Sequence, residues 1–561
     1  MNPKPLPIGT SDFKTVIENG FTYIDKSLII KEIFERGDLV VLFPRPRRFG
    51  KTLALSMLRY FLEKCDEDMA PLFHNLAIWD YPQYREKQGK YPVIFLTFKD
   101  SKHSTWEKTF NHCRQLLKEE FGRHRYLLNS NTLSPEEQED FLRLLNGEAD
   151  STLCENSLRL LTQWLYQYHK TKVIVLIDEY DAPAHSAYTG QFYRQLIEFL
   201  RNLLSGCLKD NSYLERGILT GILRIAKESI FSGMNNISTF SVLESEFHDK
   251  FGLLESEVQE LLPQYGLQEH FSEIKQWYNG YCIGTCRQVY NPWSVLNYIA
   301  RNGNLLLYWV NSADNTLMQN CISHSSGEIK AEIEQLLQGN SVEKKIEEGF
   351  IFTDLDKKPN IIWTLLLHSG YLTSDGSSNG SLQRLRIPNK EVQELYQSTI
   401  LDWFEQSLSE RKYHLLLDAL TSGDIETFSL LFKEYVKSSL SIFDISSVEP
   451  EKIYHAFVLG MLVGLKDRYA IKSNRESGLG RYDVMLIPKN KNLLGIIIEF
   501  KKISPFQKIK LSTAAKAALQ QIEQKQYAQE LLEHGIKKIL NLAIVFNGKD
   551  VEILPKFIPY Y

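Results

Sequence analysis

Residues 40–52 read VVLFPRPRRFGKT, and this stretch decides which fold the N-terminal half can adopt. Its first four residues form a short apolar run, as expected for a buried strand. After it come Gly50, Lys51 and Thr52, and then leucine and methionine at helical spacing up to about Glu63. A strand, a loop and a helix in this order predict a phosphate-binding loop, in which main-chain N–H groups, a lysine and a hydroxyl hold phosphate and Mg²⁺.

The predicted nucleotide-binding residues of this loop are Arg48, Gly50, Lys51 and Thr52. Their glycine-lysine-threonine core also arises by chance in unrelated chains. Arg45 stands where the general P-loop has a glycine. Because glycine lets the backbone approach the phosphates closely, ATP hydrolysis is a weaker expectation than ATP binding.

A second apolar run, at residues 173–177, ends directly in Asp178 and Glu179. In nucleotide-hydrolysing sheets such a strand end carries one carboxylate for Mg²⁺ and a second that polarises the attacking water. The sequence therefore assigns Asp178 to the metal, together with Thr52, and Glu179 to catalysis. A solvated acidic turn at residues 178–181 is the alternative.

A third apolar strand is expected at residues 217–222, and polar residues mark its end. Thr220 is a candidate contact for the γ-phosphate, and Arg224 is a candidate arginine finger acting in cis or in trans. A surface arginine that caps a carboxylate is an equally good interpretation of Arg224.

The C-terminal part carries a second constellation of charged residues. Asp483 lies on one expected strand, near residues 482–487, and the next strand, which includes IIIEFK at residues 496–501, contains Glu499 and Lys501. Residues two apart on a strand share a face, so Glu499 and Lys501 are expected to point the same way. Asp483 and Glu499 could then bind one divalent cation with the carbonyl of Phe500, and Glu476 is a candidate extra ligand.

In this scheme Lys501 stabilises a metal-activated hydroxide that attacks a phosphodiester. The predicted catalytic residues are therefore Asp483, Glu499 and Lys501. A Glu–Lys ladder on an edge strand is the structural alternative. Lysines between residues 501 and 525 form either a phosphate-binding patch or a solvated helix face. Gln521 and Tyr527 would support the site or simply pack.

Composition restricts the class of protein. The 561 residues carry a net charge of −4, so any nucleic-acid site must be a local patch. No apolar run is long enough to cross a bilayer, and the N-terminus has no signal-peptide pattern. The seven cysteines form no zinc-binding pattern, so we expect a reducing, cytoplasmic location and no membrane partner.

Three domains are expected. Residues 1–265 alternate strands and helices, which predicts a parallel sheet covered on both faces in an α/β P-loop NTPase domain. Residues 266–445 read as mostly helical, with a winged-helix-like hairpin whose tip is near 376–381. Residues 446–561 read as a restriction-endonuclease-like α/β domain with one long helix at about 512–534.

These motifs resemble the bacterial AAA-ATPase-like proteins fused to a PD-(D/E)XK nuclease superfamily domain. The similarity extends over residues 45–53, 177–183, 277–281 and 290–294, and C-terminally over Asp483, Glu499, Lys501 and Gln521. An arginine at position 45 is usual in this family. The resemblance implies ATP and Mg²⁺ as cofactors and a role in DNA processing.

The hypothesis from the sequence is a nucleotide-gated nuclease that hydrolyses phosphodiester bonds, with DNA favoured over RNA as partner. A nucleotide-switched scaffold with an inactive nuclease fold is the first alternative. An ATPase whose C-terminal domain only mediates homo-oligomerisation is the second.

Overall fold

The computed structural model describes residues 3–224, 230–231, 233–312, 315–323, 325, 327–337, 339–347, 349, 352–354, 358, 360–379, 382–407, 410–439, 458–473, 476–477, 480–503, 510–547 and 550–559. The chain forms two compact units. The first unit comprises Met1–Ala313 and Glu343–Val392, and the second comprises Asp314–Val342 and Gln393–Tyr561. The three-domain division at residues 265 and 445 stays a prediction.

A five-stranded sheet forms the centre of the first unit. Its strand order is β2-β3-β4-β1-β5, and every neighbouring pair is parallel, which confirms the parallel sheet expected from the sequence. The strands are β1 (Val40–Pro44), β2 (Val93–Thr97), β3 (Val173–Asp178), β4 (Leu214–Gly221) and β5 (Ile237–Thr239). All residues of β1 and β3 are buried, because helices cover both faces of the sheet.

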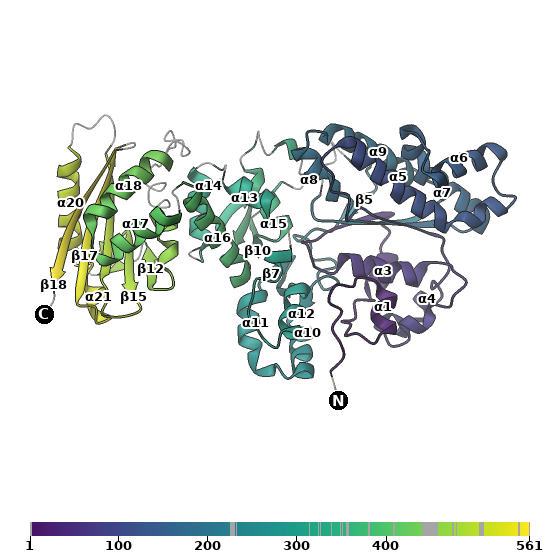
Figure 1. Ribbon diagram of the computed structural model, residues 1–561. Coiled ribbons are helices and arrows are strands. Elements are labelled where there is room, and N and C mark those ends of the chain that lie inside the picture. The colour runs from purple at the N-terminus through teal and green to yellow at the C-terminus, as the bar shows by residue number, and fades with distance from the viewer. Residues whose placement is uncertain are drawn as a thin grey trace. The chain divides into compact units, whose positions relative to one another are not determined.

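Figure 1 shows α1, α3 and α4 on one face of this sheet and α5, α7 and α9 on the other. The helices of this part are α1 (Phe13–Glu18), α2 (Ile29–Glu35), α3 (Lys51–Leu62), α4 (Pro82–Arg85), α5 (Trp106–Arg123), α6 (Pro135–Asn146), α7 (Ser151–His169), α8 (Ala182–Thr189) and α9 (Tyr193–Leu208). Side chains of α1, α2 and α3 share one core with Val41, Phe43, Ile174 and Leu176.

The strand order determines where the polar strand ends meet. Strand β4 lies between β1, which leads into the predicted phosphate loop, and β3, which ends in Asp178. Parallel strands bring their carboxyl ends to one edge of the sheet. The ends of β1, β4 and β3 therefore lie side by side there, with Thr220 of β4 in the middle.

The remaining strands of the first unit form two small sheets, β6-β8-β7 and β10-β11-β9. The antiparallel pair β10–β11 confirms the expected hairpin, whose residues 380 and 381 lie outside the described part. The elements are β6 (Leu253–Leu254), α10 (Glu255–Leu261), α11 (Phe271–Tyr278), β7 (Tyr281–Ile283), β8 (Cys286–Tyr290), α12 (Pro292–Ala300), β9 (Val342–Lys345), α15 (Ile361–Ser369), β10 (Thr373–Asn379) and β11 (Leu382–Arg386).

The second unit contains a five-stranded mixed sheet of order β12-β15-β16-β17-β18. Only β16 and β17 run parallel; the other neighbours are antiparallel. Its elements are α13 (Thr316–Ser323), α14 (Gly327–Leu337), α16 (Lys390–Ser407), α17 (Glu410–Ser422), α18 (Ile425–Ser439), β12 (Tyr469–Ser473), β13 (Glu476–Ser477), β14 (Gly480–Arg481), β15 (Val484–Pro488), β16 (Gly495–Lys502), α20 (Leu511–Gln524), α21 (Gln529–Glu533), β17 (Lys538–Asn547) and β18 (Asp550–Pro559).

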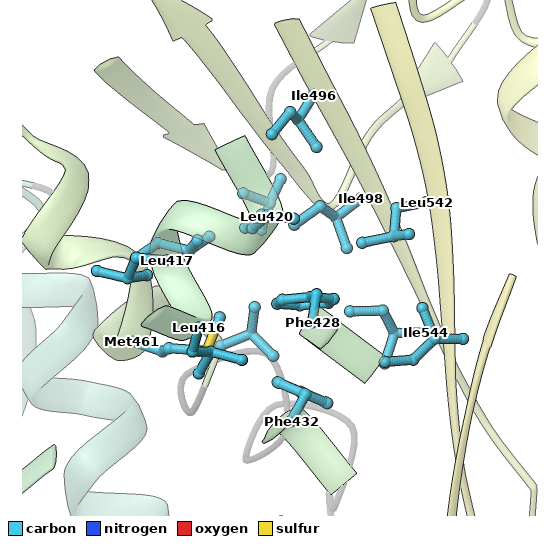
Figure 2. Close-up of a cluster of buried hydrophobic side chains, with 14 of the residues drawn as sticks. Leu416, Leu417, Leu420, Phe428, Phe432, Met461, Ile496, Ile498, Leu542 and Ile544 are labelled. Carbon is cyan, nitrogen blue, oxygen red and sulfur yellow. The ribbon is translucent and has the colours of Figure 1, made fainter. Parts of the chain in front are cut away.

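Two apolar cores lie on opposite faces of this mixed sheet. Helices α17 and α18 pack on Ile496 and Ile498, and Figure 2 shows Leu420 and Phe428 against these strands. Helix α20 packs on the other face with Ile497. Since side chains alternate along a strand, Glu499 and Lys501 lie on the same face as Ile497, the face that α20 covers.

The single long helix expected at about 512–534 is wrong. Two helices, α20 and α21, replace it. Gln526 adopts a positive φ of 54° between them, and a residue in that conformation cannot continue an α-helix. None of the helices described in the structure combines the length and the apolar character that crossing a bilayer requires.

Candidate functional sites

The loop between β1 and α3 presents an open helix N-terminus. Gly50 is the N-cap of α3 with a φ of 85°, and no side chain caps the helix there. A residue with a Cβ would be strained in this left-handed conformation. The first N–H groups of α3 therefore receive no side-chain cap, as an anion-binding helix terminus requires.

Lys51 is buried beneath this loop. Its ammonium donates hydrogen bonds to the carbonyl oxygens of Arg45 and Pro46, both at 3.0 Å. Burial lowers the pKa of Lys51, while the negative charges of Glu179, Asp178 and Asp181 act in the opposite direction. The lysine thus lies between the loop and the acidic end of β3, as the sequence predicts.

The Asp178 carboxylate gathers hydroxyl groups from three elements. It accepts hydrogen bonds from Thr52 at 2.8 Å and from Thr220 at 2.6 Å. Thr97, at the end of β2, adds a longer bond of 3.4 Å. Asp178 is fully buried. The structure therefore brings together the residues that the sequence assigned to Mg²⁺ and to the γ-phosphate.

Glu179 follows Asp178 in a left-handed conformation with a φ of 49°. Burial raises the pKa of its carboxyl group, and the nearby charge of Lys51 lowers it. Its main-chain N–H donates to the hydroxyl of Thr220 at 3.4 Å. Glutamate seldom adopts a positive φ, so this backbone is held by its surroundings.

Arg45 occupies the position where the general P-loop has a glycine, and its side chain points into the protein interior. Its guanidinium is fully buried and donates to the carbonyl oxygens of Phe240 at 2.5 Å and Pro44 at 3.1 Å. Burial lowers the pKa of Arg45 to about 10. The side chain is thus anchored on the segment that follows β5.

Arg48 and Arg224, the two arginines predicted to bind the nucleotide, differ in their exposure to solvent. Arg48 is exposed at the tip of the loop, with a φ of 64°, and its guanidinium lies 4.3 Å from the ring centre of Trp293 in α12. Arg224 is partly buried, three residues beyond the end of β4. Its role as an arginine finger stays a prediction.

The second unit brings Asp483 to Glu499. Val484 of β15 pairs with Ile498 of β16, so one further step of the antiparallel register places Asp483 opposite Glu499. The Asp483 carboxylate also accepts a hydrogen bond of 2.7 Å from the main-chain N–H of Phe500. Asp483 is thereby fixed at the edge of the strand that carries Glu499.

Glu499 is the buried centre of this second constellation. Gln521 of α20 donates to its Oε1 at 2.5 Å, and the ammonium of Lys501 lies 3.6 Å from the same oxygen. The other oxygen, Oε2, is buried and accepts no hydrogen bond from the described residues. Lys501 is 37% exposed, so its charge can reach a ligand in solvent.

The pKa of Glu499 reflects its burial and its two charged neighbours, Asp483 and Lys501. Burial and the negative charge of Asp483 together raise the pKa of Glu499 to about 8, although the positive charge of Lys501 acts in the opposite direction. A divalent cation between them would remove this penalty, because it offsets both negative charges. Glu476 lies in β13, which pairs with β14, but its side chain lies outside the described part of the structure.

Two family models match these two regions. Residues 7–231 match a predicted AAA-ATPase family, and residues 449–555 match the PD-(D/E)XK nuclease superfamily. Both matches, one to a predicted AAA-ATPase and one to the PD-(D/E)XK nuclease superfamily, lie in one chain. This confirms the resemblance recognised in the motifs. A similar protein is the "Uncharacterized protein in vnfD 5'region" of Azotobacter chroococcum mcd 1, which is 27% identical over 561 residues and 95% of each chain.

The matched ranges contain both constellations. The AAA-ATPase-like match includes Lys51, Asp178 and Thr220, and the nuclease match includes Asp483 and Glu499. Among the residues that the structure describes, no three His, Cys, Asp or Glu side chains are placed to share a metal ion. The residues present nevertheless fit Mg²⁺, which keeps several waters and uses one or two carboxylates together with substrate phosphates.

Sequence reasoning missed one contact and left another open. It missed Thr97, although a hydroxyl at the end of a strand next to β3 is a usable signal. It left Gln521 between support and packing, and the structure places its amide on Glu499. That contact depends on how α20 crosses the sheet, which residues distant in sequence decide.

Proposed function

We propose that the AAA-ATPase-like domain binds and hydrolyses ATP with Mg²⁺, and that the PD-(D/E)XK domain cleaves phosphodiester bonds in DNA in a metal-dependent reaction. The observation that carries the nuclease proposal is the Glu499 carboxylate. One of its oxygens is buried without a donor, Asp483 lies opposite, and an exposed ammonium is 3.6 Å from the other oxygen.

On the ATPase side, each residue has a distinct task. The open N-terminus of α3 and the Lys51 ammonium would receive the β- and γ-phosphates. Thr52 and Asp178, joined by a 2.8 Å hydrogen bond, would hold Mg²⁺. Glu179 would orient the attacking water, and Arg48 would contribute positive charge at the mouth of the loop.

On the nuclease side, Asp483 and Glu499 would hold the cation, with the carbonyl of Phe500 as a third ligand. The bound metal would supply Lewis-acid activation of water and would offset charge on the phosphodiester. Gln521 orients Glu499 through its 2.5 Å hydrogen bond. Lys501 supplies positive charge next to the scissile phosphate, where charge builds up during hydrolysis.

DNA is proposed over RNA because of the resemblance to the PD-(D/E)XK nuclease superfamily, and the lysines of this region would contact phosphates of either nucleic acid. Of the six lysines between residues 501 and 525, only Lys508 lies outside the described part of the structure. None of the seven cysteines forms a disulfide in the described part of the structure, which supports a cytoplasmic location. If Arg224 acts in trans, it must reach the nucleotide of a second copy of the chain, and we propose homo-oligomers only in that case.

Cleavage of supercoiled plasmid with Mg²⁺ or Mn²⁺, measured with and without ATP, tests the nuclease proposal. We expect nicking or linearisation by the wild type and none by Asp483→Ala or Lys501→Ala. The matched control is Lys489→Ala, which removes an exposed lysine of the same unit. Equal cleavage by wild type and Asp483→Ala would refute the nuclease assignment. ATP-dependent DNA binding without any cleavage would favour the scaffold alternative.

A further inference from the structure

Two residues next to the proposed catalytic acid, Tyr180 and Asp181, bind the loop that follows β4. The Oδ2 atom of Asp181 accepts hydrogen bonds from the main-chain N–H groups of Ile222 at 3.0 Å and Leu223 at 2.8 Å. The hydroxyl of Tyr180 donates to the carbonyl oxygen of Leu223 at 2.6 Å. The residues after β3 thus hold the loop after β4 through three hydrogen bonds.

Both side chains are buried, and this makes the contacts specific. Tyr180 is fully buried and Asp181 is 7% exposed. Burial raises the pKa of Asp181, and the two main-chain N–H groups lower it. A buried carboxylate is costly unless donors satisfy it, so the N–H groups of Ile222 and Leu223 are what make this position tolerable.

Gly221 shows how closely the two side chains approach the loop. A Cβ at this position would lie 2.7 Å from Oδ1 of Asp181 and 2.7 Å from the ring of Tyr180. Real Cβ atoms do not come this close to other heavy atoms. Only glycine therefore fits at this position, where the chain passes directly against both side chains.

The loop held in this way connects two proposed functional groups. Thr220, immediately before Gly221, donates to Asp178 at 2.6 Å. Arg224, immediately after Leu223, is the candidate arginine finger. The main-chain N–H of Tyr180 also donates to the carbonyl of Thr220 at 3.1 Å, which fixes the start of the loop.

We infer that Asp181 and Tyr180 are positioning residues for ATP hydrolysis, which hold the loop at 220–224 so that Thr220 and Arg224 meet the nucleotide. The inference rests on the proposed ATPase function. It separates the four residues 178–181 into two tasks. Asp178 and Glu179 face the nucleotide, and Tyr180 and Asp181 fix the neighbouring loop.

The geometry of Asp181 provides a discriminating substitution. Both N–H groups donate to the same oxygen, so an asparagine whose carbonyl oxygen takes the place of Oδ2 keeps both hydrogen bonds and removes the charge. Alanine removes both bonds. A positioning role therefore predicts different results for Asp181→Asn and Asp181→Ala, whereas a metal-binding or proton-transfer role predicts loss in both.

The test measures kcat and KM for ATP hydrolysis and the Kd for ATP in the full-length protein. We expect Asp181→Asn to keep kcat within about threefold of the wild type. We expect Asp181→Ala to lower kcat by about tenfold to a hundredfold, because a small misplacement of catalytic groups costs this much. The Kd for ATP should change little in Asp181→Ala, since the phosphate loop is untouched, and Tyr180→Phe should lie between the two.

Two results would overturn the inference. If Asp181→Asn were as inactive as Asp181→Ala, the charge itself would be required. If kcat were unchanged in Asp181→Ala, the clamp, meaning the hydrogen bonds from Asp181 and Tyr180 to the loop at 220–224, would not be required for hydrolysis. The control is Asp150→Ala, which removes the acceptor of the Leu153 N–H in the same unit, at 2.9 Å. It should leave kcat unchanged.

Hydrogen exchange separates a failure of this inference from a failure of the proposed ATPase. The amides of Ile222 and Leu223 should exchange faster in Asp181→Ala and stay protected in Asp181→Asn. A wild type that does not hydrolyse ATP would refute the ATPase proposal and, with it, the catalytic purpose of the clamp. Unchanged exchange in Asp181→Ala would refute the clamp itself, whatever the activity.

Discussion

Glu499 shows most directly how single residues determine the chemistry of this chain. Its carboxyl group is buried between Asp483 and Lys501, and its pKa is raised to about 8, so the metal-free group holds a proton at neutral pH. A carboxyl group must lose that proton to bind a cation. Metal binding at this site is therefore coupled to pH.

We predict that Mn²⁺ affinity rises by about tenfold per pH unit up to pH 8 and levels off above it, because one proton is displaced. Titration calorimetry at pH 6, 7, 8 and 9 measures this slope. Glu499→Gln should lose both the affinity and the slope, whereas Glu533→Gln, an exposed position of the same unit, should keep both. Equal Mn²⁺ affinity at pH 6 and pH 8 would contradict the assignment of Glu499 as a ligand.

At the scale of elements, Glu391 lies in the first turn of α16, whose residues up to Val392 belong to the first unit, and it joins two other segments of that unit. Its carboxylate accepts hydrogen bonds from Ser294 of α12 at 2.8 Å and from the main-chain N–H of Trp309 at 2.6 Å. The indole N–H of Trp309 in turn donates to the carbonyl oxygen of Arg47 in the phosphate loop, at 3.1 Å. The loop is thus supported by residues far beyond the parallel sheet.

Burial raises the pKa of Glu391 to about 7. The folded protein therefore keeps this proton at a pH where the unfolded chain has lost it. Stability from this group is fully present below the ordinary carboxyl pKa and is lost as pH rises toward 7. We predict that the melting temperature of Glu391→Gln, relative to wild type, increases between pH 5 and pH 8 in calorimetry. A difference that shrinks with rising pH would mean that the ionised carboxylate stabilises the fold.

The packing of α17 and α18 on the mixed sheet sets the stability of the second unit. Leu420 is fully buried among Phe428, Ile496 and Ile498 (Figure 2), whereas Leu415 on the same helix is 50% exposed. We predict that Leu420→Ala lowers the free energy of unfolding by about 2–5 kcal/mol, and that Leu415→Ala changes it by less than ~0.5 kcal/mol. Urea unfolding of each variant checks this, and equal losses would show that the core lies elsewhere.

At the scale of the whole molecule, the joined domains predict a functional link. If nucleotide gates cleavage, Lys51→Ala should weaken ATP binding by about tenfold to a hundredfold, because a buried charged donor is lost. The same variant should cleave plasmid at the wild-type rate without ATP and should show no ATP effect. Lys14→Ala, which removes a surface lysine paired with Glu67, is the control. A normal ATP effect in Lys51→Ala would separate the two activities.

Much of the fold follows from local sequence patterns. The runs at residues 40–43 and 173–177 are buried strands in the structure, and the hairpin near residue 380 forms as expected. The expected helix at 512–534 failed, because an apolar repeat continues on both sides of Gln526 while the backbone there does not remain helical. Periodicity shows which face of a segment is apolar, but it does not locate a break in the helix.

The sequence by itself determined the strand–loop–helix at Lys51, the acids that end β3 and the placement of Glu499 and Lys501 on one face, because each depends on neighbouring residues. The tertiary structure alone decided that β4 lies between β1 and β3, that Thr52 contacts a carboxylate 126 residues away, and that Gln521 reaches Glu499. It also decided that Arg45 is anchored beyond β5. The physical reason is that strand order and helix crossing are set by burial of apolar faces over the whole chain, which no local pattern specifies.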